Sequence, residues 1–311
     1  FSNIVVFSSY GMQVISSFLM IAMIFMFIPR AKISADRINE VLDEPIDVLN
    51  GEISSSGTVT HDLVFDHVSF HYPDSDENVL QDISFSAKQG QTIAIIGSTG
   101  SGKSTLLNLI VRFYDVTEGK ILLDGINIRD YTLNALHNKV GYVSQKAFMF
   151  NGTVAYNVAF GEKEGMSPSL DEICNALDIA QASEFVAEME DGVNSHIARG
   201  GTNVSGGQKQ RLSIARSIAR KPEIYLFDDS FSALDYKTDS LLRTKLKETA
   251  QDSIVFIVAQ RIGTILHADQ IVVLDEGKCV GIGTHRELLE NCKVYQEIAY
   301  SQLSKEELEN A

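Results

Sequence analysis

The first segment of the chain is strongly apolar. Residues 1–29 carry no charged side chain, and an unbroken apolar run extends from Phe18 to Ile28. Because about 20 such residues cross a bilayer as a helix, residues 1–30 are predicted to form a transmembrane helix. The segment has neither the initiator Met nor the basic start and cleavage site of a signal peptide. We therefore expect it to be the last helix of a longer membrane domain; a buried helix of a soluble domain is the weaker alternative.

Polar side chains interrupt this helix on one face. Ser9, Gln13 and Ser17 recur at four-residue intervals, which places them on one stripe. In a membrane such a stripe usually faces neighbouring helices, and the other interpretation is a wet, substrate-lining cavity. Arg30 and Lys32 follow directly, and the positive-inside rule places this end of the helix in the cytoplasm.

Residues 31–61 are expected to connect the membrane helix to a second domain. Apolar and charged positions are interspersed at helical spacing from residue 31 to residue 44, which predicts an amphipathic connecting helix. Pro45 disfavours its continuation. Gly51 and the run Ser54-Ser55-Ser56-Gly57 are typical of a linker.

The pattern then changes to strands around a glycine-rich loop. Residues 63–72 and 78–87 have strand spacing, and residues 92–96 form a β-branched run typical of a buried strand. A helical pattern begins after residue 105. The residues between match GxxxxGK[ST] in its required strand–loop–helix context, and they are Gly97, Ser98, Thr99, Gly100, Ser101, Gly102, Lys103, Ser104 and Thr105.

This loop predicts a site for a nucleoside triphosphate. Glycines let the backbone curl so that successive N–H groups point at phosphate oxygens, and the helix that follows adds its positive end. Lys103 can reach the β- and γ-phosphates, and the Ser104 hydroxyl can bind Mg²⁺. A merely flexible loop would explain neither the Lys-Ser pair nor the flanking strand and helix.

Two further motifs extend this chemistry. A second buried run, residues 224–227, ends in Asp228 and Asp229, and carboxylates delivered in this way position Mg²⁺ and the attacking water. Between the two runs lies a second helix start with anion-binding geometry, formed by Ser205, Gly206, Gly207 and Gln208. One γ-phosphate needs only one such cradle, so the second suggests a nucleotide held between two chains.

The charge balance argues against one class of partner. The chain has 26 Lys and Arg residues against 41 Asp and Glu residues, for a net charge of −15. Binding to nucleic acid requires clustered basic side chains, so no nucleic-acid partner is expected. Three cysteines, with no CxxC pair and no neighbouring histidine cluster, argue against a disulfide scaffold and a structural zinc site.

In their order and spacing, these motifs resemble the C-terminal part of an ATP-binding cassette (ABC) exporter from about residue 62 to residue 300. The resemblance implies an α/β fold, namely a P-loop NTPase with a RecA-like core, a small antiparallel β subdomain and a helical signature subdomain at about residues 150–220. A transmembrane helix would precede this nucleotide-binding domain, which would span residues 62–311. Its cofactors would be ATP and Mg²⁺, and its activity would be ATP hydrolysis that drives transport.

The resemblance also assigns residues outside the phosphate loop. Tyr72 matches the aromatic side chain that stacks on adenine, and Gln145 matches the glutamine that contacts Mg²⁺ and relays to the transmembrane part. Residues 205–208 match the signature motif, which in this family caps the γ-phosphate bound to the opposite protomer. Residues 232–235 match the loop that crosses the dimer interface.

Several positions depart from the family pattern. Asp229 stands where most active members have a Glu that acts as general base or water positioner, and its side chain is one methylene shorter. Gln260 replaces the switch histidine; it can donate a hydrogen bond to a γ-phosphate but cannot carry a charge. Because a misplacement of about 1 Å can cost a hundredfold in rate, weak hydrolysis is expected. Val204 for the usual Leu and Arg199 for the usual Glu lie at and before the signature.

The paired departures at residues 229 and 260 resemble the degenerate-site subunit of a heterodimeric, multidrug-type exporter. Lys103, Asp229 and Gln260 would then form a weak catalytic site, and the signature would complete the competent site of the partner. The metal ion would be held by Ser104, Gln145 and Asp228.

Two alternatives remain open. A homodimeric exporter would use Asp229 as a slow base, and a soluble ABC protein of DNA repair or translation is disfavoured by the apolar residues 1–29. For the exporter, the expected partners are a second half-transporter subunit, membrane lipid and a small-molecule or peptide substrate. Its expected location is the cell membrane, as a multi-pass protein with a cytoplasmic nucleotide-binding domain.

Overall fold

A computed structural model describes residues 2–55, 62–161 and 165–303. The chain forms two compact units, which divide between Asp47 and Val48. Residues 56–61 of the expected linker and the last eight residues of the expected nucleotide-binding domain lie outside the described residues.

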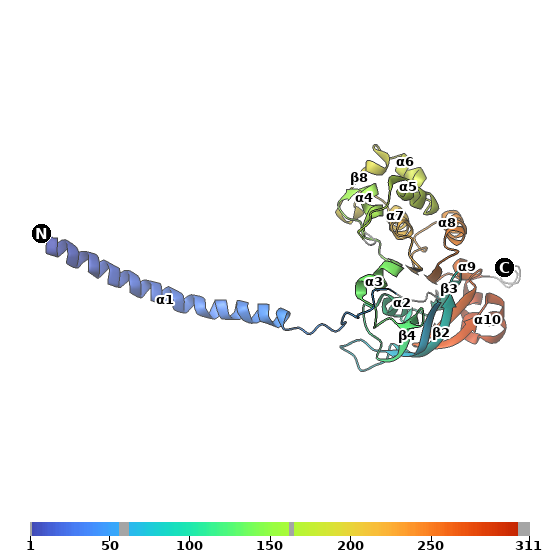
Figure 1. Ribbon diagram of the computed structural model, residues 1–311, viewed down its shortest axis with the longest axis horizontal. Coiled ribbons are helices and arrows are strands. Elements are labelled where there is room, and N and C mark those ends of the chain that lie inside the picture. Colours follow the sequence, from blue (N-terminus) through green and yellow to red (C-terminus); the bar gives the residue numbers. More distant parts are fainter. Residues whose placement is uncertain (1, 56–61, 162–164, 304–311) are drawn as a thin grey trace. The chain divides into compact units, whose positions relative to one another are not determined.

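The first unit is built on one long helix, α1 (Ser2–Leu42). This helix continues through Pro29, so the stretch predicted as a connecting helix extends the apolar helix without a break (Figure 1). A proline removes only one N–H donor, and apolar helices tolerate that loss. Ser17 Oγ donates to Gln13 O at 2.9 Å, so this hydroxyl of the polar stripe is satisfied by its own helix.

The apolar side chains of α1 are exposed throughout the described residues of the helix. None of them is buried, and Phe7 and Phe25 are 81% and 71% exposed. By length and composition the helix could cross a membrane. An apolar surface of this size requires lipid or another protein surface to cover it.

In the second unit, a ten-stranded sheet organises the fold. Five of its strands are parallel, and they are short, β-branched and mostly buried, as strands covered on both faces must be. Their order is β6-β9-β10-β3-β11. The strands are β3 (Thr92–Gly97), β6 (Val140–Val143), β9 (Ile224–Asp228), β10 (Ile254–Val258) and β11 (Gln270–Asp275).

The other strands pair antiparallel with their neighbours, apart from one parallel contact that joins β12 to β2. In the register of β1 and β2, Phe65 lies opposite Phe85, and their rings stack with centroids 4.6 Å apart. These strands are β1 (Asp62–Phe70), β2 (Leu80–Lys88), β4 (Glu118–Leu123), β5 (Ile126–Asn127) and β12 (Lys278–Gly283). The first two match the predicted runs at residues 63–72 and 78–87 to within two residues, and the other three were not predicted.

Two apolar cores flank the parallel strands. One encloses α2 (Lys103–Val111) between the parallel strands and the antiparallel β1, β2 and β4, while the other lies on the opposite face, under the helices of the second half of the unit. The helices of this layer are α8 (Tyr236–Thr249), α9 (Ile262–Ile265), α10 (His285–Asn291) and α11 (Lys293–Gln302). Helix α3 (Leu133–Lys139) instead packs through Leu136 in the core that contains α2.

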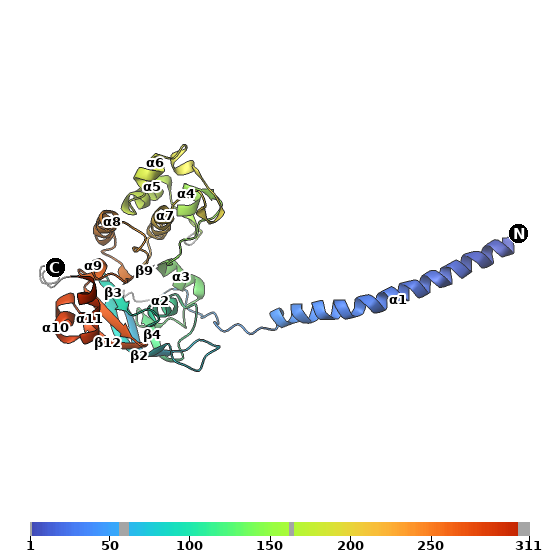
Figure 2. The same ribbon diagram turned by 180° about the vertical axis from the view of Figure 1, so that it is seen from behind.

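A helical lobe projects from the sheet (Figures 1 and 2). It is centred on α7 (Gly206–Ala219), which packs against α4 and α5, and it coincides with the region predicted as the signature subdomain. Its other elements are β7 (Gly152–Thr153), α4 (Val154–Ala159), α5 (Leu170–Ile179), α6 (Ser183–Ala187), the 3₁₀ turns Gly192–Asn194 and Arg199–Gly201, and β8 (His196–Ile197).

Part of the expected linker is bound to the second unit as an extended strap, residues 49–53. The N–H groups of Gly51 and Ile53 donate to Tyr131 O and Asp130 O at 3.2 and 2.9 Å, and Thr132 N donates to Ile53 O at 2.8 Å. These bonds form a short parallel bridge between Ile53 and Tyr131. The strap therefore belongs to the second unit.

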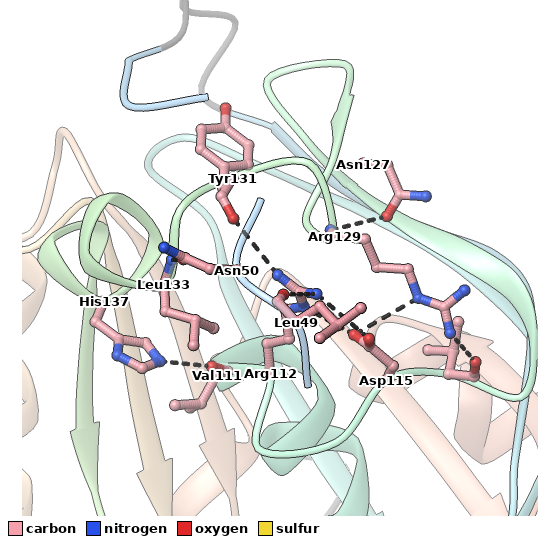
Figure 3. Close-up of polar contacts among 11 residues, drawn as sticks. Leu49, Asn50, Val111, Arg112, Asp115, Asn127, Arg129, Tyr131, Leu133 and His137 are labelled. Carbon is pink, nitrogen blue, oxygen red and sulfur yellow. Dashed lines mark hydrogen bonds and ion pairs between the residues drawn. The ribbon is translucent and has the colours of Figure 1, made fainter. Parts of the chain in front are cut away.

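Arg112, the residue at the C-terminal end of α2, holds the strap (Figure 3). Its guanidinium donates to Leu49 O at 2.8 Å and to Tyr131 O at 3.4 Å, and its Nε pairs with Asp115 at 2.8 Å. Arg112 is 4% exposed, so each of these acceptors would lose a buried donor with the side chain. The strap is thus tied to the far end of the helix that follows the phosphate loop.

We expect Arg112→Ala to lower the free energy of unfolding of the second unit by about 2–4 kcal/mol, because it removes a buried cationic donor from the Asp115 carboxylate and from the carbonyl groups of Leu49 and Tyr131. Lys120→Ala is the matched control, since Lys120 forms an exposed ion pair with Asp66 and should cost about 1 kcal/mol or less. Chemical denaturation of both variants measures the difference. Equal losses would contradict the assigned role of Arg112.

Candidate functional site

The phosphate loop connects β3 to α2, as predicted from the sequence. Gly102, the residue before α2, has φ 96°, and a Cβ atom there would lie 2.6 Å from Leu80 Cδ2. A Cβ atom at Gly97 would lie 2.1 Å from Leu274 O. Both positions therefore require glycine: Gly102 because of its backbone conformation and the nearby Leu80 side chain, and Gly97 because the backbone of Leu274 approaches it closely.

Lys103 closes over this loop. Its Nζ donates to Gly97 O at 2.9 Å and to Ser98 O at 2.6 Å. Burial lowers the pKa of the Lys103 ammonium, and the charges of Asp229 and Asp228 oppose that shift. The loop thus holds a cation above its backbone, next to the N-terminus of α2, where an anion is favoured.

Ser104 and Asp228 form a pair that suits a divalent cation. Ser104 Oγ donates to Asp228 Oδ1 at 2.9 Å, and Tyr142 Oη lies 3.4 Å from Asp228 Oδ2. Burial raises the pKa of Asp228, although the hydrogen bonds from Ser104 and Tyr142 oppose the shift. Mg²⁺ is commonly held by one or two protein oxygens, with water and phosphate completing its shell. A hydroxyl beside a buried carboxylate fits that requirement.

Asp229 accepts hydrogen bonds from two side-chain amides. Gln260 Nε2 donates to Asp229 Oδ2 at 2.8 Å, and Gln145 Nε2 donates to the same oxygen at 3.2 Å. The Asp229 backbone has φ 47°, a left-handed conformation that Asp tolerates better than most residues. The two positions that depart from the family pattern are therefore in direct contact.

A cavity of about 240 Å³ connects these groups. Ser101 Oγ on the loop is buried and has no hydrogen-bond partner among the described residues, an unmet polar group of the kind that a bound anion could satisfy. The residues that line the cavity are Val79, Thr99, Gly100, Gly102, Lys103, Ser104, Thr105, Gln145, Asp228, Asp229, Val258 and Gln260.

Tyr72 lies beside this cavity, against the phosphate-loop helix. Its hydroxyl is 3.0 Å from Thr105 Oγ1, and its ring contacts Phe70 and Tyr114 edge-on. Tyr72 is half-buried. The stacking on adenine that the resemblance implies remains a proposal.

The signature residues lie outside the cavity. Ser205 caps α7 by accepting from Gln208 N at 3.3 Å, and Gln208 Oε1 accepts from Ser205 N at 2.8 Å, which makes a reciprocal capping box. A Cβ atom at Gly206 would meet nothing within 4 Å. This helix start is thus preformed and exposed. Val204 beneath it is 9% exposed within the core, and the Arg199 side chain is exposed.

Sequence reasoning missed Tyr142 as a neighbour of Asp228. It lies on β6, which pairs with β9 so that Tyr142 stands opposite Leu226. Burial and the charge of Asp228 raise the pKa of the Tyr142 hydroxyl, which keeps it protonated as a donor. Its position before Gln145 was visible in the sequence, but the strand pairing that brings it to Asp228 was not.

The strand–loop–helix unit and the Ser104–Asp228 pair place this unit in the class of P-loop nucleotide-binding proteins. Residues 80–232 match the sequence profile of the ABC transporter family. The chain therefore carries an ATP-binding domain of the ABC transporter family, which confirms the predicted fold class, the ATPase class and ATP with Mg²⁺ as the cofactors of such a domain.

Individual relatives agree with this assignment. The chain is 44% identical over 302 residues to an ABC transporter ATP-binding protein of Mycobacterium bovis, covering 96% of this chain and 52% of that protein. It is 40% identical over 260 residues to a Staphylococcus aureus protein named for multidrug export as an ATP-binding/permease protein, covering 83% and 44%. A bacterial Atm1-family ABC exporter structure with ATP bound superposes with a TM-score of 0.81 at 33% identity, covering 90% and 49%. The chain spans about half the length of these relatives.

The buried charge of Asp228 should cost stability when no cation is bound. Its pKa in the fold lies above the ordinary 3.8, so between these two values the native chain binds more protons than the unfolded chain and stability falls as pH rises. We expect Asp228→Asn without nucleotide to be at least as stable as the parent at pH 7, and to lack this decrease.

Asp235→Asn is the control of opposite sign. Hydrogen bonds from Thr238 lower the pKa of Asp235, so its charge contributes stability above the ordinary pKa, and the variant should lose some at pH 7. Thermal unfolding from pH 3 to pH 7 checks both, because this range begins below the ordinary pKa of 3.8. A clear loss of stability for Asp228→Asn at pH 7 would show that the ionised Asp228 carboxylate does not destabilise the fold.

Proposed function

We propose that the chain is the ATP-binding and ATP-hydrolysing part of an ABC exporter that drives substrate efflux by nucleotide-dependent dimerisation. In this proposal its own site is degenerate and pairs with the signature of a second half-transporter subunit, in a heterodimer. The fold, the family match and the export-related names of its relatives support the exporter assignment. The contact between Asp229 and Gln260 carries the proposal of degeneracy.

Hydrolysis requires a group that accepts or orients the attacking water. Asp229 Oδ2 already accepts from the amides of Gln260 and Gln145, and both donors are neutral at every physiological pH. The shorter Asp side chain also reaches less far than a Glu would. With no histidine at position 260, no side chain there can carry positive charge toward a developing anion.

Binding of Mg-ATP needs none of these lost features. The loop amides of residues 97–105 and Lys103 would hold the phosphates, and Ser104, Asp228 and Gln145 would hold Mg²⁺, which neutralises phosphate charge. Tyr72 would stack on adenine. Ser205, Gly206, Gly207 and Gln208 would meet the nucleotide bound by the partner subunit, because they form an exposed helix N-terminus away from this cavity.

The helix α1 supports a location in the cell membrane. Its exposed apolar surface would contact lipid and the other helices of a multi-pass domain. The stripe of Ser9, Gln13 and Ser17 would face neighbouring helices, and the transported small molecule or peptide would bind among helices of that domain. The nucleotide-binding unit would then lie in the cytoplasm.

A homodimeric exporter is the second candidate. The observation that favours it is the retained carboxylate at Asp229, which lines the cavity with Lys103. In that case Asp229 would act as a slow base in both sites of the dimer.

Restoring the family residues tests the degenerate site. We expect the purified parent protein to bind Mg-ATP but to hydrolyse it weakly, and the double variant Asp229→Glu/Gln260→His to turn over at least about tenfold faster, because a longer base and an ionisable side chain return. Steady-state phosphate release is the measurement. Lys103→Ala in each background is the control for contaminating ATPase; brisk turnover by the parent that Lys103→Ala abolishes would overturn the proposal.

Mixing experiments separate the heterodimer from the homodimer. If the chain works with a competent partner, adding a half-transporter with Glu and His at the two positions should restore turnover, and Asp229→Asn in this chain should reduce it little. If the chain forms a homodimer, Asp229→Asn should abolish turnover and no partner should be needed. ATPase rates in nanodiscs with each pairing distinguish these results.

A further inference from the structure

The loop between β10 and α9 carries Gln260 and is held from outside by one side chain. Gln302, at the end of α11, lies across this loop: its Oε1 accepts from Ile262 N at 2.9 Å, and its Nε2 donates to Gln260 O at 2.8 Å. The amide thus bonds one backbone group on each side of Arg261.

This loop needs such a support. Helix α9 has only four residues, and Arg261 at its N-cap makes no capping hydrogen bond with its side chain. The first N–H groups of a helix have no partner within the helix, and an Arg side chain has no acceptor to offer them. Gln302 therefore supplies, from 40 residues away, an acceptor for Ile262 N, the first of these N–H groups.

The support itself is well anchored. Tyr295 and Ala299 of α11 are fully buried in the core, and Tyr295 Oη lies 2.7 Å from His285 Nδ1 on α10. The backbone that carries Gln302 is therefore fixed to the sheet. Because α11 is fixed, the amide of Gln302 restrains the loop.

The restrained loop points the Gln260 side chain at the cavity. From Gln302 the hydrogen bonds run through the Gln260 backbone and side chain to Asp229 Oδ2, where Gln145 also donates. If this loop were free to move, the Gln260 amide could lose its hydrogen bond to Asp229. The amide could also move away from the space in which a γ-phosphate would lie. The position of one side chain in the cavity thus depends on a helix that does not line it.

We propose that Gln302 is a positioning residue that holds Gln260 where its amide can distinguish a triphosphate from a diphosphate. The proposal rests on the proposed function, since it assumes that the cavity binds adenine nucleotides. Gln302 touches no nucleotide in this account. It acts through the backbone of the 259–262 loop.

The test compares affinities for ADP and for a non-hydrolysable ATP analogue with Mg²⁺, measured by calorimetry on the full protein in detergent. Gln302→Ala should bind the analogue roughly 3- to 10-fold more weakly, as expected for the loss of one or two hydrogen bonds, while its affinity for ADP stays unchanged. Ser301→Ala is the matched control, because the Ser301 hydroxyl donates to Ile298 O on its own helix and to no other group among the described residues. That variant should behave as the parent.

Two further variants make the test specific. Gln302→Glu keeps the acceptor for Ile262 N but places a carboxylate against Gln260 O. At pH 7 this variant should therefore weaken binding of the ATP analogue as Gln302→Ala does. It keeps the test decisive even if the alanine variant folds poorly. In the Gln260→Ala background, Gln302→Ala should have no additional effect on the ratio of the two affinities. An unchanged ratio in Gln302→Glu, or additive effects in the double variant, would overturn the positioning role. If the parent binds neither nucleotide, the proposed function itself fails, and the positioning role fails with it.

Discussion

The burial of α2 between the parallel and the antiparallel parts of the sheet is the constraint on which the rest of the second unit depends. Six of its nine residues are buried, and they pack against strands of both the parallel and the antiparallel parts. A helix in such a place cannot leave its terminal N–H and C=O groups to bulk water. Its N-terminal groups face the phosphate loop, and its C-terminal end is closed by Arg112 in a left-handed conformation, whose N–H donates to Leu109 O. The candidate site and the strap are thus two ends of one buried element.

The candidate site places two carboxylates side by side and has few cationic side chains to balance their charge. A chain of net charge −15 places two carboxylates at the end of β9, and Lys103 is the cation nearest to them among the residues that line the cavity. Asp228, the proposed ligand of Mg²⁺, accepts from a hydroxyl group on each of its oxygens. Asp229 is instead satisfied by neutral amides, so its negative charge is accommodated without a second cation. The two carboxylates thus differ in their partners, since Asp228 accepts from hydroxyl groups on both oxygens and Asp229 accepts from two amides on one oxygen.

The sequence predicted the elements whose signals are local. The loop after β3, the carboxylates after β9 and the capped start of α7 each lie within a stretch of about ten residues, so their spacing alone identified them. The contacts of Gln260 and Gln145 with Asp229, of Tyr142 with Asp228, of Arg112 with Leu49 and of Gln302 with Ile262 join residues far apart in the chain, and strand order and helix placement create them. The unbroken course of α1 from the apolar residues 1–30 into the amphipathic residues 31–42 was not predicted either, because a change of pattern alone does not show whether one helix continues.

The substitution of Asp at position 229 has a backbone reason as well as a chemical consequence. The residue has φ 47°, where Asp is several-fold more frequent than larger side chains without a local hydrogen bond to offer. A Glu at this position would have to adopt the same left-handed backbone conformation. Its longer side chain would place the carboxylate differently relative to Gln260 and Gln145. Asp at this position therefore suits both the left-handed backbone and the hydrogen bonds that its carboxylate accepts. On this argument the two substitutions at positions 229 and 260 form one unit, since the short acid sets the place of the oxygen and the glutamine supplies the neutral donor that it accepts.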